Sequence, residues 1–260
     1  MSLYEVDHLT RVYATGRRRV VALDDVSLRV ERGQRLGIVG ESGSGKSTLI
    51  RLMAALDRPT SGEVRFEGRP VSGLPERRLG FLRSAVQLVF QDPRGSLNPR
   101  MRVGDIVAEP LRSPTIRAEL GGVDRTRRVR DLLDAVGLPA DATRRFPHEF
   151  SGGQRQRIAI ARALAPSPDV LIADEAVSAL DVSVRAQVLN LLMSLVDELG
   201  LTLLFVSHDL AVVRHVCPDA IVLQAGRIVE AGPTQALFTA PQHPYTARLV
   251  AAIPQFRTHP

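Results

Sequence analysis

The feature that most constrains this chain is a glycine-rich octapeptide, GESGSGKS, at residues 40–47, directly after the apolar segment RLGIV. It contains Lys46, the only lysine among 34 basic residues, so the other 33 are arginines. A slim, flexible ammonium reaches between phosphate oxygens, a task that the broad planar guanidinium performs badly. The motif therefore predicts a loop that binds the phosphates of a nucleotide.

The segments around this loop are the strand and helix that such a loop needs. Alternating apolar and polar residues predict strands over residues 3–13, 20–30 and 35–40, and the last runs straight into the glycines. Residues 47–56 are predicted to form the helix behind the loop. The alternative is a glycine-rich turn with an incidental Gly-Lys-Ser, and the flanking strand and helix argue against it.

After this start the hydrophobic pattern changes. Short strands are predicted at residues 62–68 and 84–90, and alternation then fades. Helical spacing follows in three segments, which are residues 103–111, 125–137 and 152–165. We therefore expect a helical subdomain inserted into the core.

The last third of the chain returns to buried strands. Continuous apolar runs at residues 169–175 and 201–209 are typical of parallel strands covered on both faces. Asp181 is predicted to cap the helix between them, with apolar residues at helical spacing, which are Val184, Val188, Leu191 and Leu195. Residues 220–232 predict a strand–turn–strand unit, and two short helices are expected in the tail.

Together these segments predict an α/β fold in one domain, residues 1–260, with no internal repeat and hence a single nucleotide cassette. We expect the nucleotide-binding core, with an N-terminal antiparallel β subdomain, in residues 1–90 and 166–240. The inserted helical subdomain is expected in residues 91–165, and a C-terminal tail in residues 241–260.

Composition narrows the class of protein. The fractions of hydrophobic (44%) and charged (24%) residues are those of an ordinary globular chain. Tryptophan is absent and one cysteine, Cys217, is present, which argues against an aromatic platform and excludes an internal disulfide or a four-cysteine metal site. No apolar run approaches the length of a membrane span, and the first residues resemble no targeting peptide. The net charge of +6 comes from scattered arginines, so we expect a solvated basic surface and no nucleic acid partner.

The phosphate loop has a distinct role for each residue type. Backbone amides at Gly40, Gly43 and Gly45 can turn inward around phosphate oxygens, aided by the helix N-terminus. Lys46 supplies a point charge, and the Ser47 hydroxyl suits Mg²⁺. The residues expected to contact the nucleotide are Gly40, Glu41, Ser42, Gly43, Ser44, Gly45, Lys46, Ser47 and Thr48.

Polar residues follow two of the buried strands. Asp174 ends the run VLIAD and Glu175 follows it; Asp174 is placed to hold Mg²⁺ and Glu175 to act as base for the attacking water. His208 follows LTLLFVS, where a neutral imidazole can contact the γ-phosphate. Alone, such residues more often belong to solvated turns, but a phosphate loop in the same chain favours the catalytic interpretation.

A second anion site is predicted in FSGGQRQR, residues 150–157. Ser151, Gly152 and Gly153 open a helix and offer amides, a hydroxyl and the positive end of the helix dipole. The alternative is a simple N-cap before an amphipathic helix.

These motifs resemble the ATP-binding cassette (ABC) ATPases over nearly the whole chain. The resemblance implies a P-loop NTPase with a RecA-like core, and a head-to-tail dimer in which ATP at Lys46 is closed over by the signature residues of the partner, here Ser151, Gly152, Gly153 and Gln154. It also implies ATP contact from Asp181 in the D-loop, and a Mg²⁺-sensing and catalytic role for Gln91. Tyr13 is placed to stack on adenine, with a plain strand aromatic as the alternative.

A finer resemblance is to the oligopeptide/dipeptide/nickel branch of ABC importers, in the segments FQDPRGSLNPRMRVGDIVAEPL (90–111) and QHPYTARLVAAIP (242–254). The stretch DEAVSALDVSVRAQVLNLL is similar to the second ATPase of such importers. Ala176 stands where most of the superfamily has proline, and the cysteine cluster of many peptide-importer members is absent, so a nickel or metallophore substrate stays open.

The resemblance implies an ATPase subunit at the cytoplasmic face of a membrane, with ATP and Mg²⁺ as ligands. Its expected partners are transmembrane permeases, a second ABC ATPase in preference to a second copy of itself, and indirectly a solute-binding protein. The alternative is a non-transport ABC ATPase that acts on nucleic acid, in repair or in cluster assembly. Those proteins usually carry two cassettes or zinc modules, and this chain has neither.

Overall fold

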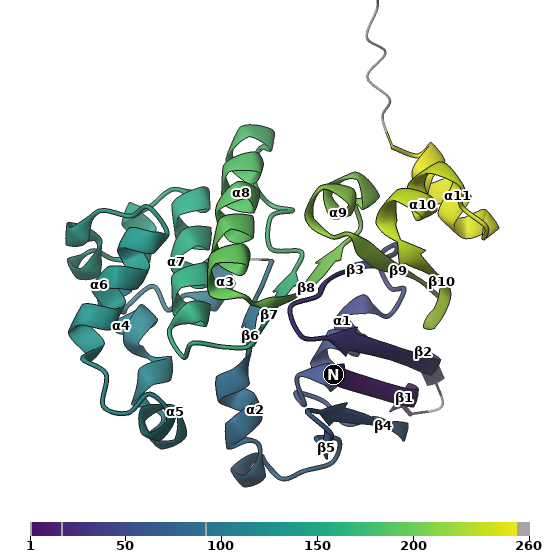
Figure 1. Cartoon of the computed structure of the whole chain (residues 1–260), viewed down its shortest axis with the longest axis horizontal. Coiled ribbons are helices and arrows are strands. Elements are labelled where there is room, and N and C mark those ends of the chain that lie inside the picture. The colour runs from purple at the N-terminus through teal and green to yellow at the C-terminus, as the bar shows by residue number, and fades with distance from the viewer. Residues whose placement is uncertain (1, 17, 92, 254–260) are drawn as a thin grey trace, which may run out of the picture. The chain divides into compact units, whose positions relative to one another are not determined.

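The computed structural model describes residues 2–16, 18–91 and 93–253 (Figure 1). The chain divides into two compact units, Met1–Gly73 with Leu204–Pro260, and Leu74–Leu203. None of the helices in the described part of the chain has both the length and the apolar character that crossing a bilayer requires. The predicted tail extends to residues 254–260, which lie outside the described residues, as do Arg17 and Asp92.

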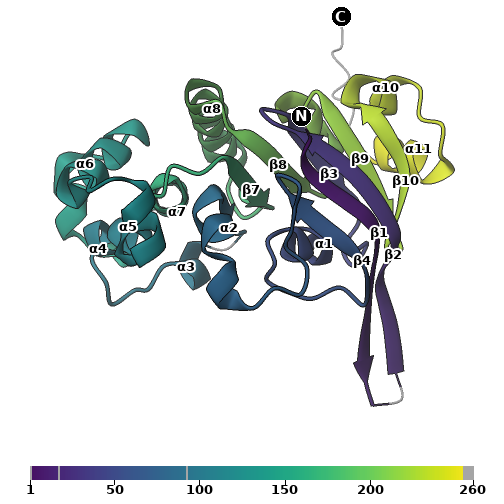
Figure 2. The same cartoon turned by 60° about the horizontal axis from the view of Figure 1, so that its bottom comes forward.

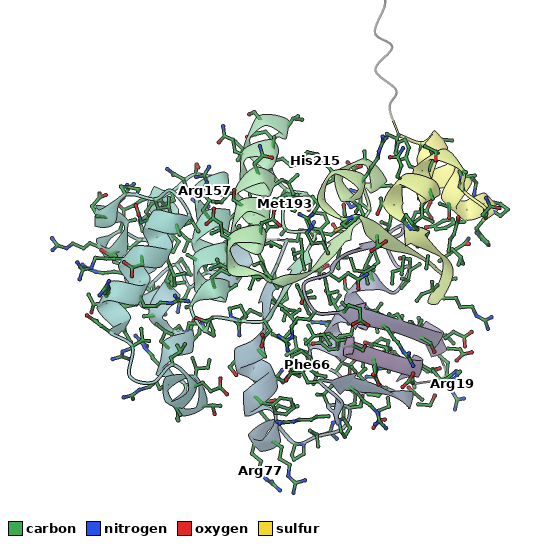
Figure 3. The ribbon with its side chains drawn as sticks, in the orientation of Figure 1. Arg19, Phe66, Arg77, Arg157, Met193 and His215 are labelled. Atoms are coloured by element: carbon green, nitrogen blue, oxygen red, sulfur yellow. The ribbon has the colours of Figure 1, made fainter. Side chains whose placement is uncertain are left out.

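The first unit begins with an antiparallel sheet in the order β2-β1-β4-β5. Its strands are β1 (Ser2–Thr15), β2 (Arg18–Glu31), β4 (Ser61–Phe66) and β5 (Arg69–Pro70). Tyr4 and Phe66 are buried and place their ring centroids 5.0 Å apart across the β1–β4 pair; Figure 3 labels Phe66. The β1–β4 ladder ends at Thr10 and Ser61, so the tip of β1 pairs only with β2, as the long hairpin in Figure 2 shows.

The same unit holds the strand that leads into the glycine loop. Here β3 (Arg35–Val39) pairs in parallel with β9 (Asp219–Gln224), which pairs antiparallel with β10 (Arg227–Pro233). On the other side of β3 lies β8 (Thr202–Ser207), within which the boundary between the units falls. The helices of this unit are α1 (Lys46–Met53), α9 (Leu210–Val216), α10 (Thr234–Thr239) and α11 (Pro244–Ala251).

The second unit consists mainly of helices around a parallel strand pair, β6 (Val86–Val89) and β7 (Val170–Asp174). Its α-helices are α2 (Gly80–Ala85), α3 (Pro93–Ser96), α4 (Val103–Ala108), α5 (Pro114–Glu119), α6 (Arg125–Ala135), α7 (Gly152–Leu164) and α8 (Val182–Leu199). Its 3₁₀ turns are η1 (Glu76–Arg78), η2 (Pro110–Arg112), η3 (Ala140–Arg144) and η4 (Pro147–Glu149). Helix α4 packs against α6, α7 and η3.

Arginines in the second unit tie these helices together. Arg162 donates from Nη1 to the carbonyl oxygen of Ser96 at 2.6 Å, and Arg128 donates from Nη2 to that of Leu164 at 3.0 Å. Burial lowers the pKa of both guanidiniums. The labelled Arg19, Arg77 and Arg157 in Figure 3 lie on separate elements, in keeping with the predicted scatter of basic residues.

Most predicted elements differ from the observed ones by one or more residues at their ends, and two of these differences involve β6 and α1. The strand expected over residues 84–90 runs only from Val86 to Val89, because Ser84 and Ala85 belong to α2, where the Ser84 hydroxyl donates to the carbonyl oxygen of Phe81 at 3.0 Å. The helix expected over residues 47–56 ends at Met53, and Ala55 has a left-handed φ of 49° that stops the helix. The other predicted strands are present, and of the three helical segments predicted within residues 91–165, the first divides into α4 and the 3₁₀ turn η2.

Candidate functional site

The glycine loop bridges β3 and α1 in a backbone path that only glycine permits. Gly43 and Gly45 have φ values of 79° and 110°, which lie in the left-handed region. A Cβ on Gly45 would lie 2.5 Å from the carbonyl oxygen of Ala22, and one on Gly40 would lie 2.4 Å from that of Leu223. The strand, loop and helix that the motif requires are therefore all present, and the neighbouring backbone fixes the loop.

Lys46 is folded into this loop. Its side chain is 5% exposed, and Nζ donates to the carbonyl oxygens of Gly40 and Glu41 at 2.6 and 2.8 Å. Helix α1 begins at Lys46, and its N-cap Gly45 makes no side-chain cap hydrogen bond, a geometry that suits an anion at the positive end of the helix. Ser47 is exposed and Thr48 half-buried in this first turn, while the hydroxyl of Ser44 is buried inside the loop.

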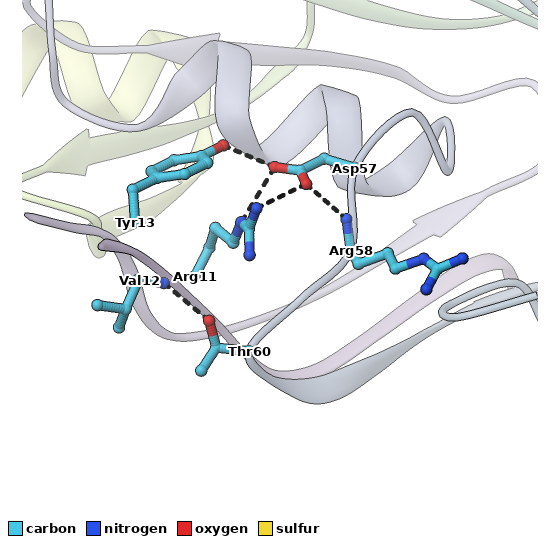
Figure 4. Close-up of polar contacts among 6 residues, drawn as sticks. All are labelled: Arg11, Val12, Tyr13, Asp57, Arg58 and Thr60. Atoms are coloured by element: carbon cyan, nitrogen blue, oxygen red, sulfur yellow. Dashed lines mark hydrogen bonds and ion pairs between the residues drawn. The ribbon is translucent and has the colours of Figure 1, made fainter. Parts of the chain in front are cut away.

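Tyr13 belongs to a polar cluster at the tip of β1, drawn in Figure 4. Its hydroxyl donates to Asp57 Oδ2 at 2.7 Å, and Arg11 donates to both Asp57 oxygens at 3.0 and 2.8 Å. Arg11 and Tyr13 share a face of the strand, and the guanidinium lies 4.4 Å from the ring centroid. Burial opposes ionisation, but the hydrogen bond from Tyr13, the amide of Arg58 and the charge of Arg11 lower the pKa of Asp57. The ring is therefore held rigidly; its stacking on adenine remains a prediction.

In the second unit, Asp174 is the last residue of β7 and Glu175 follows directly, so both lie at the strand end, as predicted. Glu175 has a φ of 48°, which is strained for a residue with a Cβ and is typical of functional positions. Its carbonyl oxygen accepts hydrogen bonds from the N–H and the hydroxyl of Ser178, both at 3.0 Å. Ala176, in the place of the proline common in the superfamily, is buried and contributes to the core. The turn thus positions Glu175 through the backbone.

The segment after Phe150 forms a capped helix start. Ser151 is the N-cap of α7: its hydroxyl accepts from Gln154 N at 3.3 Å, while Gln154 Oε1 accepts from Ser151 N at 2.9 Å. Ser151, Gly152 and Gln154 are exposed. A Cβ on Gly153 would lie 2.3 Å from Val184 Cγ1, so this glycine lets α7 and α8 approach closely. The capping alternative is confirmed as geometry, and the contact with a nucleotide remains a prediction.

The D-loop differs from its prediction in one respect. Asp181 stands at the N-cap position of α8, but its exposed side chain makes no cap hydrogen bond, so the predicted side-chain cap is wrong. Arg185 instead fixes this turn, donating to the carbonyl oxygens of Ser178 and Leu180 at 3.4 and 3.1 Å. The Asp181 residue itself is exposed.

Gln91 and His208 are also at the surface. Gln91 is exposed after β6, next to Phe90, whose carbonyl oxygen accepts from the buried Gln156 at 3.5 Å. His208 is exposed after β8 and precedes Asp209, which caps α9.

Each unit thus contains part of the predicted set. The glycine loop, Tyr13 and His208 lie in the first unit, and Gln91, Asp174, Glu175, Ser151 to Gln154 and Asp181 lie in the second.

One residue of the site was missed from sequence. Tyr245, on α11, accepts a hydrogen bond on its hydroxyl oxygen from the N–H of Glu41 in the glycine loop, at 2.9 Å. In the sequence, the HPYT segment indicates only the resemblance to the importer branch. Nothing in its local pattern indicates a contact with a residue so far away in the chain.

Comparisons with known proteins agree with these motifs. Residues 23–178 match the family described as ABC transporter, and residues 229–259 match the oligopeptide/dipeptide transporter C-terminal region. The dipeptide transport ATP-binding protein DppF of Haemophilus influenzae is 50% identical over 92% of this chain and 72% of its own length. A putative peptide import ATP-binding protein of Brucella abortus is 50% identical over 98% of this chain and 78% of its own length.

Solved structures agree on the fold. The ATP-binding cassette MJ0796, in a dimeric post-hydrolysis state bound to ADP and Pi, is 30% identical with a TM-score of 0.77, covering 89% of this chain and 98% of its own. The cassette cbiO1 from Clostridium perfringens is 27% identical with a TM-score of 0.78, covering 92% and 91%. The fold is therefore that of a P-loop ABC cassette, and this chain belongs to the ABC transporter family.

Proposed function

We propose that this chain is the ATP-hydrolysing subunit of a membrane importer for peptides. The observation that carries the proposal is the coexistence of an intact glycine loop with a C-terminal region of the oligopeptide/dipeptide transporter type. The names of the relatives, which refer to dipeptide transport and peptide import, support this substrate class. They give no support to the alternative of a non-transport ATPase that acts on nucleic acid, repair or cluster assembly. Nickel or a metallophore is the other substrate class that the sequence leaves open, and the transport experiment below tests it together with peptides.

The glycine loop is proposed to hold the triphosphate. Lys46 would exchange its two carbonyl acceptors for phosphate oxygens, which is a short movement for a side chain already folded into the loop. The uncapped start of α1 adds backbone donors to the same anion. Tyr13, fixed by Asp57 and Arg11, is proposed to stack on the adenine.

Hydrolysis needs a base and a divalent cation. Glu175 is proposed to accept the proton of the attacking water, and hydrogen bonds to its carbonyl oxygen stabilise the strained backbone turn after β7. The donors proposed for Mg²⁺ are Ser47, Asp174 and Gln91, a set of hydroxyl, carboxylate and amide oxygens that this cation prefers. When bound, Mg²⁺ would neutralise charge that develops on the phosphate oxygens. His208 is proposed to contact the γ-phosphate.

The second anion site is proposed to act on the nucleotide of another subunit. The exposed helix start at Ser151 to Gln154, with Asp181 near the start of α8, would close over ATP held by the partner's glycine loop. The dimeric state of MJ0796 supports an arrangement of two cassettes. We propose a pair with a different ATPase, bound to transmembrane permeases at the cytoplasmic face of the membrane, with a solute-binding protein delivering the peptide. ATP closes the pair and hydrolysis opens it.

The test is transport itself. The chain is co-purified from membranes of its source with whatever permeases and second ATPase accompany it, and the complex is placed in proteoliposomes. ATP-dependent accumulation of labelled dipeptides is expected, and nickel accumulation alone would identify the other substrate class. Isolation without any membrane protein, with ATPase activity stimulated by DNA or RNA, would contradict the proposal.

A further inference from the structure

The C-terminal region reaches the glycine loop through one buried tyrosine. Tyr245 is 3% exposed, and its hydroxyl oxygen accepts the N–H of Glu41 at 2.9 Å. The contact is made to the backbone of the second loop residue and does not depend on the Glu41 side chain. Burial raises the pKa of Tyr245, so the hydroxyl stays neutral at physiological pH.

Glu41 is also the residue that receives Lys46. Its carbonyl oxygen accepts Lys46 Nζ at 2.8 Å and the N–H of Ser44 at 3.2 Å. Tyr245 therefore fixes the N–H of a residue whose carbonyl fixes both the ammonium and the turn of the loop. A rotation of the backbone at Glu41 would displace Lys46 and Ser44 together.

Tyr245 is itself held by its own segment. The N–H of Tyr245 donates to Nδ1 of His243, the N-cap of α11, at 3.2 Å. The carboxylate of Glu230, on β10, accepts the N–H groups of Gln242 and His243 at 2.9 and 3.0 Å. Burial works against ionisation of Glu230, yet these hydrogen bonds lower its pKa overall, so it remains a charged acceptor at neutral pH. A continuous set of contacts thus runs from β10 to the glycine loop.

We propose that Tyr245 is a positioning residue through which the C-terminal region sets the affinity of the glycine loop for nucleotide. It contacts no phosphate; it acts through Glu41, holding the loop in its ligand-binding shape before the ligand arrives. A loop that is already ordered loses less conformational entropy on binding, which increases affinity. The inference rests on the proposed nucleotide site at Lys46.

The test is Tyr245→Phe, which removes the hydroxyl and keeps the buried ring. The Kd of a fluorescent ATP analogue and the KM for ATP are expected to rise about three- to tenfold, the effect of one lost hydrogen bond on a binding equilibrium, with kcat little changed. Exchange of the Glu41 amide proton, followed by NMR in the nucleotide-free chain, is expected to become faster. Glu230→Gln should raise the Kd in the same direction by a smaller factor.

Tyr4→Phe is the matched control. Tyr4 is fully buried in the same unit, and its hydroxyl donates to the carbonyl oxygen of Met53 at 3.2 Å, at the other end of α1. Tyr4→Phe is expected to lower thermal stability without changing the Kd or Glu41 exchange. An unchanged Kd and unchanged exchange in Tyr245→Phe, or an equal rise in Kd in both variants, would overturn the proposal. Lys46→Ala distinguishes failure of the Tyr245 proposal from failure of the proposed nucleotide site. Unchanged nucleotide binding in Lys46→Ala would refute the nucleotide site itself.

Discussion

The two proposed anion sites of this chain, the glycine loop and the helix start at Ser151, are built in opposite ways. In the glycine loop the lysine is buried, a Cβ on Gly40 or Gly45 would collide with neighbouring backbone, and the Tyr245 hydroxyl accepts the N–H of Glu41. At the helix start, Ser151, Gly152 and Gln154 are exposed, and the serine and glutamine side chains satisfy each other. The loop is shaped to hold a ligand within one chain, whereas the helix start presents groups outward, as a site that needs a second chain would.

The largest effect is expected from Glu175→Gln. Nucleotide binding should persist, while ATP turnover should fall about 10²- to 10⁴-fold, the usual contribution of a general base. Turnover is measured by phosphate release, with Glu198→Gln, an exposed position on α8, as the charge-matched control. Near-normal turnover would show that another group is the base.

Lys46→Ala is expected to remove nucleotide binding. The loss of charge-assisted contacts should raise the Kd of a fluorescent ATP analogue by about 10- to 100-fold or more. Binding should then be undetectable in a titration at micromolar concentrations of the analogue. Arg51→Ala, an exposed position on the same helix, is the control and should bind normally. Equal affinities in these two variants would assign the phosphates to another part of the chain.

Ser151→Arg is expected to remove ATP-dependent association of two chains while leaving nucleotide binding by the single chain intact. Nucleotide binding by the single chain should be unchanged, because the exposed helix start belongs to the partner's site. ATP-dependent association, with itself or with the second ATPase, should be lost in light scattering on a Glu175→Gln background, since a bulky cation replaces the helix cap. Ser194→Arg, on an exposed position of α8, should associate normally. A simultaneous loss of binding would place Ser151 in its own chain's site.

The smallest effect is expected from Asp57→Asn. The folded pKa of Asp57 is lowered, so its stabilisation is present above the unfolded value of about 4 and is lost as pH falls through the folded value. The variant should unfold about 1–3 kcal/mol more easily in denaturant at pH 7, and the difference should shrink below pH 4. Asp25→Asn, which breaks the exposed pair with His8, should cost far less. A difference that grows at low pH would contradict this assignment.

The sequence was sufficient where a motif dictates backbone geometry. The glycines at 43 and 45 require positive φ, and the strand before them and the helix after them follow from hydrophobic spacing. Local spacing was less informative at helix ends: Ser84 and Ala85 belong to α2 although they continue the alternation of the next strand, and the left-handed backbone of Ala55 stops α1. The Tyr245–Glu41 and Arg11–Asp57 contacts join distant segments, which no local pattern specifies.

Mixing two variants tests whether one chain's loop and another chain's helix start form a shared ATP site. On the Glu175→Gln background, Lys46→Ala and Ser151→Arg are each expected to stay monomeric with ATP. Mixed, they should yield dimers in light scattering, because one intact loop then meets one intact Ser151 in the same pair. If the parent variant dimerises with ATP and the mixture stays monomeric, the shared site is contradicted.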